Sequence, residues 1–307
     1  MITEAQRERR KTGIFSSDVP RIMNGNGVLV ALEKMGAEPE ANYDDVIEVE
    51  IGQLIEPAIL DAYAELEKVD FIRSPDTIRH PVHQWLGAHL DGLWPGVLDI
   101  DSKAVGWYRR SLWGDGGDEI PDDVMWQVQE QMLVAGVNLA KVPVCFINEE
   151  SLKHLLIWMR DVSLGNPPKL PPITVFTISA DAELQDHIIQ RAGYVWHCVE
   201  NMEYPLPEKP SDIRLIYKKD TGYAVEATEE IAALWEQALA AQAIKSAADK
   251  EEARLKFQIQ EFMKDAAELR HNGRTLATFK TNTGRAGYTV EPVEPFRSFL
   301  LKKKKEK

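Results

Sequence analysis

The stretch HLDGLWPGVLDIDSK, residues 89–103, places three aspartates and a lysine in a run that is otherwise apolar and turn-forming. Residues 97–100 are typical of a strand that enters a core, where an unpaired carboxylate is costly to bury. Because side chains alternate along a strand, Asp101 and Lys103 are predicted to point to one face, with Asp99 joining them a step earlier. The pattern therefore predicts an acid and a lysine around one small volume.

Asp91 lies ten positions before Asp101 and is followed by Gly92, a pair typical of turns. A hairpin here would bring the Asp91 carboxylate to the volume shared by Asp101 and Lys103. Two acids and a backbone carbonyl would make a partial cage for Mg²⁺, which takes hard oxygen ligands and keeps several waters. With a lysine beside it, such a site suits phosphodiester hydrolysis. The spacing alone is a weak signal, because Asp-Gly turns and Asp-x-Lys triplets are common by chance.

The composition is that of an ordinary soluble globular protein, with 307 residues of which 44% are hydrophobic and 28% charged. This length allows one large domain or two ordinary ones. The cysteines Cys145 and Cys198 are too few for a disulfide scaffold or a four-cysteine metal site, and they favour a reduced compartment. The N-terminus lacks the apolar core of a signal peptide, and no run reaches the roughly 18 apolar residues of a membrane span. We expect a soluble cytoplasmic protein without membrane contact.

The formal net charge of -13 argues on average against a polyanionic partner, because phosphate binding draws on Lys and Arg. The average does not describe the site, however. A nuclease that holds divalent cations needs carboxylates where the metal lies, so local basic patches can coexist with an acidic chain.

The hydrophobic pattern predicts a mixed α/β (α+β) core. Apolar residues at helical spacing predict helices over 28–35, 46–66, 122–134 and 180–203. Short apolar runs predict strands over 71–73, 78–80, 85–91 and 97–105, and then a late strand pair over 142–147 and 152–160.

The proline-rich run 204–210 predicts a boundary between a domain of residues 1–204 and an extension of residues 211–307. The extension is rich in Ala, Glu and Lys and is predicted to form two long helices, over 228–247 and 250–271. A hairpin is expected over 275–290, around Asn282-Thr-Gly-Arg285. The four lysines at 302–305 are most simply a solvated tail, with phosphate contact as the alternative.

An ordered set of short motifs surrounds the acids and spans about residues 10 to 160. It consists of Arg10-x3-Ile14-Phe-Ser-Ser-Asp18, Gly52-Gln-Leu-Ile-Glu56-Pro, His89-Leu-Asp91-Gly, Asp101-Ser-Lys103, Trp113-Gly, Glu119-Ile-Pro121 and Gln127-Val-Gln129. This order resembles the YqaJ-like viral recombinase family, or lambda-type exonucleases, within the restriction-endonuclease-like PD-(D/E)XK nucleases. The resemblance implies a restriction-endonuclease-like core with a central mixed sheet flanked by helices, with the helical extension added to it.

The family's acid-x-lysine triplet fits this sequence in two registers. If it were Asp99-Ile-Asp101, the lysine would be lost; Asp101-Ser-Lys103 fills every role, and we take this register. The resemblance then implies that Asp91, Asp101 and the Ser102 carbonyl bind the metal, and that Lys103 is the catalytic lysine. Asp99 would be either an acid that contacts the metal ligands and not the metal itself, or a strand end that faces solvent.

Two further residues are assigned by the same resemblance. Glu56, on the helix over 46–66, resembles a further acid at the metal site, although it could instead be a polar residue at the edge of a buried stripe. Gln127 resembles a helix glutamine near the metals, where an amide can hold a ligand or a water. Gln129 lies two positions on and is expected to turn away.

Arg10 and Ser17 resemble the family's pocket for a DNA 5′-phosphate. Ser17 or Asp18 is a plausible N-cap of a helix that begins at Val19, and a helix N-terminus is a ready anion site. Lys11 could replace Arg10 in this role. The alternative is an exposed arginine beside an ordinary cap.

Aromatic residues and histidines also gather around the motif. His80, His83 and His89 invite a zinc hypothesis, but their spacing fits no common site. Most of the nearby tryptophans should be core, although one on a loop could stack on an end base: Trp85, Trp94, Trp107, Trp113 and Trp126.

The resemblance implies an Mg²⁺-dependent deoxyribonuclease, with Mn²⁺ as an alternative ion, that resects double-stranded DNA ends in the 5′ to 3′ direction in phage-type homologous recombination. It also implies a homotrimer, a single-strand annealing protein as partner, and a phage or prophage protein acting in the bacterial cytoplasm. Two alternatives stay open. One is an endonuclease or nickase of the same fold, and the other is a non-catalytic DNA-binding assembly protein whose motif has decayed.

Overall fold

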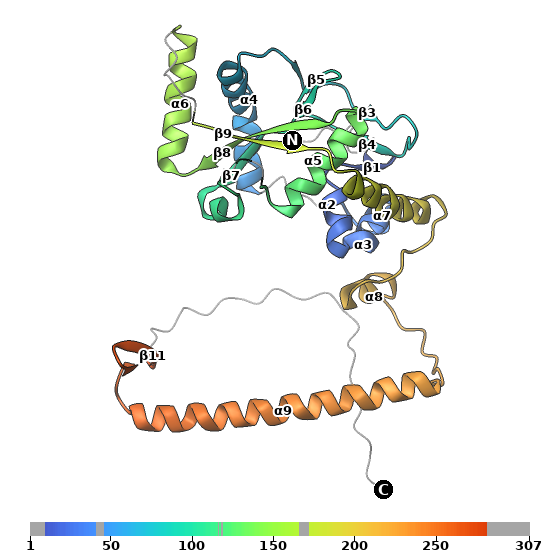
Figure 1. The fold of residues 1–307 in the computed structure, drawn as a ribbon. Coiled ribbons are helices and arrows are strands. Elements are labelled where there is room, and N and C mark those ends of the chain that lie inside the picture. The colour runs from blue at the N-terminus through green and yellow to red at the C-terminus, as the bar shows by residue number, and fades with distance from the viewer. Residues whose placement is uncertain (1–9, 41–45, 116, 118, 166–171, 281–307) are drawn as a thin grey trace. The chain divides into compact units, whose positions relative to one another are not determined.

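The structure is a computed structural model that describes residues 10–40, 46–115, 117, 119–165 and 172–280 (Figure 1). The chain divides into two compact units, residues 1–216 and residues 217–307. The first unit holds a mixed α/β core, and each unit is described by itself below.

The central sheet of the first unit has six strands. They are β2 (Ile72–Arg73), β5 (Gly92–Trp94), β6 (Leu98–Ile100), β7 (Lys103–Gly106), β8 (Leu139–Ile147) and β9 (Thr174–Ser179). The order is β2-β5-β6-β8-β7, with β9 paired to β8. β5 and β6 form an antiparallel hairpin, and β6 and β7 are both parallel to β8. The sheet is therefore mixed.

β6 and β7 are two halves of one strand that is interrupted at Asp101 and Ser102. β6 pairs with residues 140–141 of β8, and β7 pairs with residues 144–147. Asp101 N still donates to Lys141 O, at 3.1 Å. Because polar backbone groups of alternate residues point to the same edge of a strand, position 143 faces the interruption. That position is Pro143, which has no N–H to donate, so the partner strand lacks a donor where the ladder is broken.

Helices cover both faces of this sheet (Figure 1). On one face, α5 (Asp122–Ala135) packs Val128 and Met132 against alternate residues of β8, namely Val142, Val144 and Phe146. On the other face, Cys145 of β8 packs with α4 (Ile47–Glu67) and α6 (Glu149–Ser163). Leu98 and Ile100 of β6 also contact α4, so Asp99 between them faces α5.

A smaller sheet with the order β1-β4-β3 forms the second layer of this unit, from β1 (Ile14–Phe15), β3 (Ile78–Arg79) and β4 (Leu86–Ala88). It shares an apolar cluster with α2 (Val19–Arg21), η1 (Ile22–Asn26), α3 (Gly27–Lys34) and α7 (Ala182–Glu200). α8 (Pro210–Ile216) is the last helix of the unit. This layer positions Arg10 and Ser17.

The prediction of a strand over 152–160 is wrong, because these residues lie in α6. Asn148 and Ser151 form a capping box in which the Asn148 side chain accepts from Ser151 N at 2.7 Å and Ser151 Oγ accepts from Asn148 N at 2.8 Å. These caps start a helix, and Leu155 and Trp158 bury one side of it. The antiparallel partner of β8 is instead β9, which the sequence pattern did not reveal.

The second unit contains α9 (Glu229–Met263), β10 (Glu268–His271) and β11 (Arg274–Thr278). The prediction of two helices is wrong, because residues 247–250 contain no glycine or proline and the helix runs through them for 35 residues. β10 and β11 form a hairpin that the sequence analysis did not predict. Asn272 and Gly273 have φ of 48° and 78° and form its two-residue turn. The turn expected at residues 282–285 lies outside the described residues.

Within the residues described, no helix combines the length and the apolar character needed to cross a bilayer.

Candidate active site

The interruption of the strand assembles the residues of the opening motif. The β5–β6 hairpin places Asp91 beside Ser102, whose amide and hydroxyl both donate to Asp91 Oδ2 at 2.8 Å. Asp101 N donates to β8, so the amide of Ser102, one residue further on, points to the opposite edge of the strand. β5 pairs with β6 along that edge, so the backbone of Ser102 holds Asp91 in place there.

Asp101 is buried and is held by three side chains. Lys103 Nζ lies 2.6 Å from Asp101 Oδ2. The amides of Gln127 and Gln131 donate to Asp101 Oδ1 at 3.2 and 3.0 Å. Lys103 Nζ also donates to Gln127 Oε1 at 3.3 Å, which closes a triangle. The structure thus brings together Asp91, Asp101, Lys103 and Gln127.

Gln131 was missed by the sequence analysis. It follows Gln127 by four positions on α5 and so lies on the same face of that helix. This spacing was the signal that could have found it. Gln129 turns away, as expected: its side chain donates to Ser179 O and accepts from Asp181 N, both at 2.9 Å. Its contacts join α5 to the start of α7.

Asp99 is completely buried, so the alternative of a strand end facing solvent is wrong. Neither carboxylate oxygen has a hydrogen-bond partner among the described residues. Burial, and then the charge of Asp101, raise the pKa of Asp99 well above its usual range. Asp99 therefore favours the protonated form.

Glu56 approaches the site from α4, on the other face of the sheet. α4 lies close over β7, since a Cβ placed on Gly52 would be 3.9 Å from Cβ of Ala104. Burial and the charge of Asp101 raise the pKa of Glu56, while Lys103 lowers it. Glu56 is thus electrostatically coupled to the site.

Carboxylates outnumber the single ammonium at this site. Burial and the Asp101 carboxylate raise the pKa of Asp91 to about 7, although Lys103 lowers it. Burial alone would lower the pKa of Lys103, but the charges of Asp101 and Asp91 outweigh it and raise that pKa. An excess of oxygen donors and negative charge is what a divalent cation requires, so the donor set fits one. Within the described part of the chain, no three Asp, Glu, His or Cys side chains yet form a metal-binding group.

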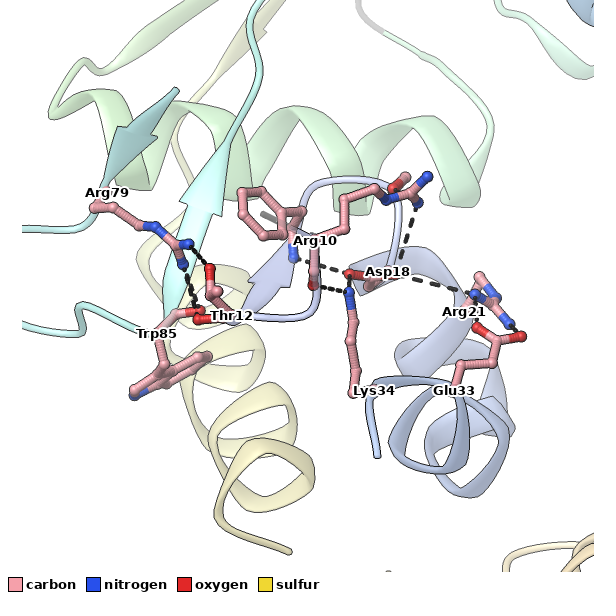
Figure 2. A network of polar contacts seen from close by, with 10 residues as sticks. Arg10, Thr12, Asp18, Arg21, Glu33, Lys34, Arg79 and Trp85 are labelled. Atoms are coloured by element: carbon pink, nitrogen blue, oxygen red, sulfur yellow. Dashed lines mark hydrogen bonds and ion pairs between the residues drawn. The ribbon is translucent and has the colours of Figure 1, made fainter. Parts of the chain in front are cut away.

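A second polar network lies around Arg10, whose Nη2 donates to Ser17 Oγ at 2.8 Å. Beneath them Asp18 is buried, accepts from Phe15 N at 3.0 Å and pairs with Lys34 Nζ at 2.6 Å. Figure 2 shows Lys34 reaching both Asp18 and the backbone of Arg10, whose carbonyl accepts from Lys34 Nζ at 2.7 Å. Lys34 therefore ties Arg10 to the loop that carries Ser17.

The expected N-cap differs from the observed one. Asp18 occupies the N-cap position of α2, but its side chain makes no capping hydrogen bond. The carboxylate instead turns back to Phe15 and Lys34. α2 is also only three residues long, so the helix N-terminus adds little to an anion site here.

Charge in this network is nevertheless positive. Arg10 and Arg21 each lie 4.0 Å from Asp18, and Arg21 makes a bidentate pair with Glu33 at 2.7 Å. With Lys34, three cations face the carboxylates of Asp18 and Glu33, and Glu130 nearby favours the uncharged form because burial raises its pKa well above the usual range. An anion beside Arg10 and Ser17 would offset this excess.

The remaining aromatic candidates have ordinary contacts or exposed positions. His80 Nδ1 accepts from His83 N at 2.9 Å, and His89 stacks on Phe15. Trp113 is buried in the apolar cluster beneath α5, whereas Trp107 is exposed.

Residues 7–138 match the YqaJ-like viral recombinase domain, which confirms the resemblance predicted from the motifs. This match covers less than half of the chain, and the mixed α/β core around it has the arrangement that the sequence analysis predicted. The predicted fold class is therefore confirmed.

Two solved structures share this fold. The alkaline exonuclease LHK-Exo from Laribacter hongkongensis superposes with a TM-score of 0.50 at 16% identity, covering 65% of this chain and 94% of that one. Its complex with dAMP gives a TM-score of 0.51 with the same identity and coverage. At such identity the likeness shows the fold alone. No curated protein matches the sequence.

Proposed function

We propose that this chain is a metal-dependent deoxyribonuclease that degrades double-stranded DNA from its ends. The observation that carries the proposal is the cluster of Asp91, Asp101, Lys103 and Gln127 at the interrupted strand of a YqaJ-like domain. A family of phage recombinases with this fold favours a role in homologous recombination.

The chain's own residues have distinct roles in this proposal. Asp91, Asp101, Glu56 and the Ser102 carbonyl would hold Mg²⁺ or Mn²⁺, which when bound supplies an activated water and stabilises the leaving oxygen. Lys103 orients the nucleophile and neutralises charge that develops on the phosphate. Gln127 and Gln131 fix Asp101, so that its carboxylate does not depend on Lys103 alone for its position.

The 5′ to 3′ direction rests on Arg10 and Ser17. Their paired side chains and the net positive charge around them suit the terminal phosphate of a 5′ end. A homotrimer that encircles DNA, a single-strand annealing protein as partner and action in the bacterial cytoplasm complete the proposal by family resemblance.

Cleavage assays on three DNA forms test this function. With Mg²⁺, linear duplex should release nucleotides, whereas covalently closed circles should stay intact. Nicked or relaxed circles as products would support an endonuclease, and binding without cleavage would support a non-catalytic DNA-binding protein.

Two lysines of the same sheet provide a matched pair for the site. Lys103→Ala should abolish hydrolysis, measured well below its unfolding midpoint because the pair with buried Asp101 also contributes to stability. Lys141→Ala removes a lysine of β8 whose Nζ donates to Thr177 Oγ1, at 2.9 Å, and should retain activity. Equal activity of the two variants would rule out the assigned role of Lys103.

A further inference from the structure

A short helical turn follows directly on the strand that carries Lys103. β7 runs from Lys103 to Gly106, and η2 (Trp107–Leu112) begins at the next residue. At about 3.3 Å per residue of strand, Trp107 lies about 13 Å along the chain from Lys103. Stacked nucleotides repeat at about 3.4 Å along one strand, so this span corresponds to about four nucleotides.

The aromatic side chains of η2 are exposed. Trp107 is 55% and Tyr108 79% exposed, and no residue of η2 is buried. The Tyr108 ring is nevertheless positioned, because a Cβ placed on Gly106 would lie 2.6 Å from its Cε1 and 3.1 Å from its Cδ1. The absence of a side chain at Gly106 thus gives the ring a backbone surface to lie on.

Two arginines follow these rings. Arg109 is partly exposed, and its Nη2 lies 3.4 Å from Asp123 Oδ2. Arg110 is held more firmly: its guanidinium lies 4.9 Å from the Phe146 ring centroid, Nη1 donates to Trp113 O at 2.8 Å and Nη2 donates to Asp115 Oδ1 at 2.7 Å. Aromatic rings next to fixed cations are the combination that binds single-stranded nucleic acid, because bases stack and phosphates pair with the arginines.

We propose that η2 is a binding site for unpaired nucleotides at a DNA end, in which a base stacks on Trp107 or Tyr108 and Arg109 faces the sugar-phosphate backbone. The inference rests on the proposed nuclease function and adds a substrate preference to it. Position favours DNA over a second protein surface, since the turn follows directly on the strand that carries Lys103 and Arg109 keeps 43% of its side chain exposed beside Asp123. Ends with unpaired bases are the class of DNA that this site selects.

Binding of fluorescent DNA by the full chain in Ca²⁺, which shares the oxygen ligands of Mg²⁺, tests the site without relying on cleavage. Blunt duplex and duplex with a short oligo-dT overhang are compared. Tyr108→Leu and Trp107→Leu should each weaken binding to the overhang duplex by about 10-fold, with a smaller effect on the blunt duplex. Gly106→Ala should reproduce the Tyr108→Leu effect, because it displaces the ring.

Trp94→Leu is the matched control, since Trp94 is also exposed, at 39%, but lies in β5. It should bind both duplexes as the unmodified chain does. Unchanged overhang binding by both η2 variants would overturn the inference, as would a change of oligomeric state in light scattering, which would assign the turn to a subunit contact. If the unmodified chain cleaves DNA but the η2 variants bind normally, the inference fails alone. If it binds overhangs through η2 but never cleaves, the proposed nuclease function fails instead.

Discussion

Replacement of Lys34 by methionine should destabilise the first unit and weaken its preference for 5′-phosphorylated ends. The Lys34 and Asp18 side chains are only 3% and 2% exposed, and their charged atoms lie 2.6 Å apart. Removing one partner of a buried ion pair typically costs about 3 to 5 kcal/mol, because the other charge stays buried. Arg10 and Arg21, each 4.0 Å from Asp18, offset part of that charge. We therefore expect the lower end, about 3 kcal/mol.

Urea unfolding of Lys34→Met measures this loss directly, and thermal unfolding should show a midpoint about 6 to 12 °C lower for a unit of this size. Lys68→Met is the matched control, because Lys68 also pairs with a carboxylate, that of Glu65, but is 72% exposed. That change should cost less than about 1 kcal/mol.

The DNA readout separates positioning from stability. Lys34 holds the carbonyl of Arg10, so the ratio of degradation rates on 5′-phosphate and 5′-hydroxyl ends should fall toward the ratio of Arg10→Ala, measured well below the unfolding midpoint. The reasoning is refuted if Lys34→Met loses no more stability than Lys68→Met, or if its rate ratio equals that of the unmodified chain.

Three further predictions concern the acids. Activity should rise with pH through about 7 at low Mg²⁺, because the Asp91 carboxylate must lose its proton before it can hold a cation, and saturating Mg²⁺ should move the midpoint to lower pH; a midpoint indifferent to Mg²⁺ would contradict this. Asp99→Asn should stabilise the fold at neutral pH. The raised pKa of Asp99 means that stability is lost as pH rises above its ordinary value of 3.8, so the gain should vanish in acid when urea unfolding is followed against pH. Ca²⁺ should tighten binding to DNA ends, with little effect on Asp91→Ala; tight metal-independent binding by the unmodified chain would favour the non-catalytic alternative.

The sequence pattern predicted those features of the structure that depend on residues close together in the chain. The alternation of residues 97–105 predicted that Asp99, Asp101 and Lys103 share a face, and the structure has all three directed to α5. The same pattern could not reveal the interruption at Ser102, since that depends on Pro143, about forty positions further along the chain.

The errors also have physical causes. Residues 152–160 have a short apolar run that fits either a strand or a helix, and the capping box at Asn148 decides for the helix. The pair of Lys34 and Asp18 joins two separate helices, and no periodicity within either helix signals it. An ion pair of this kind forms only when the two segments pack together in the folded chain.

Pro143 also determines which substitutions can change the geometry of the active-site segment. A substitution at Ser102 cannot restore the regular ladder by itself, because β8 has no donor to offer at that level. Substitutions within the segment from Asp101 to Lys103 therefore cannot turn it into a regular strand. A residue with no charge or catalytic role can change this geometry instead: Pro143→Val would supply the missing donor, which the carbonyl of Asp101 faces, and would draw the backbone of Asp101 into the ladder with β8. Variants that lose activity although every charged residue is kept should therefore be sought on β8.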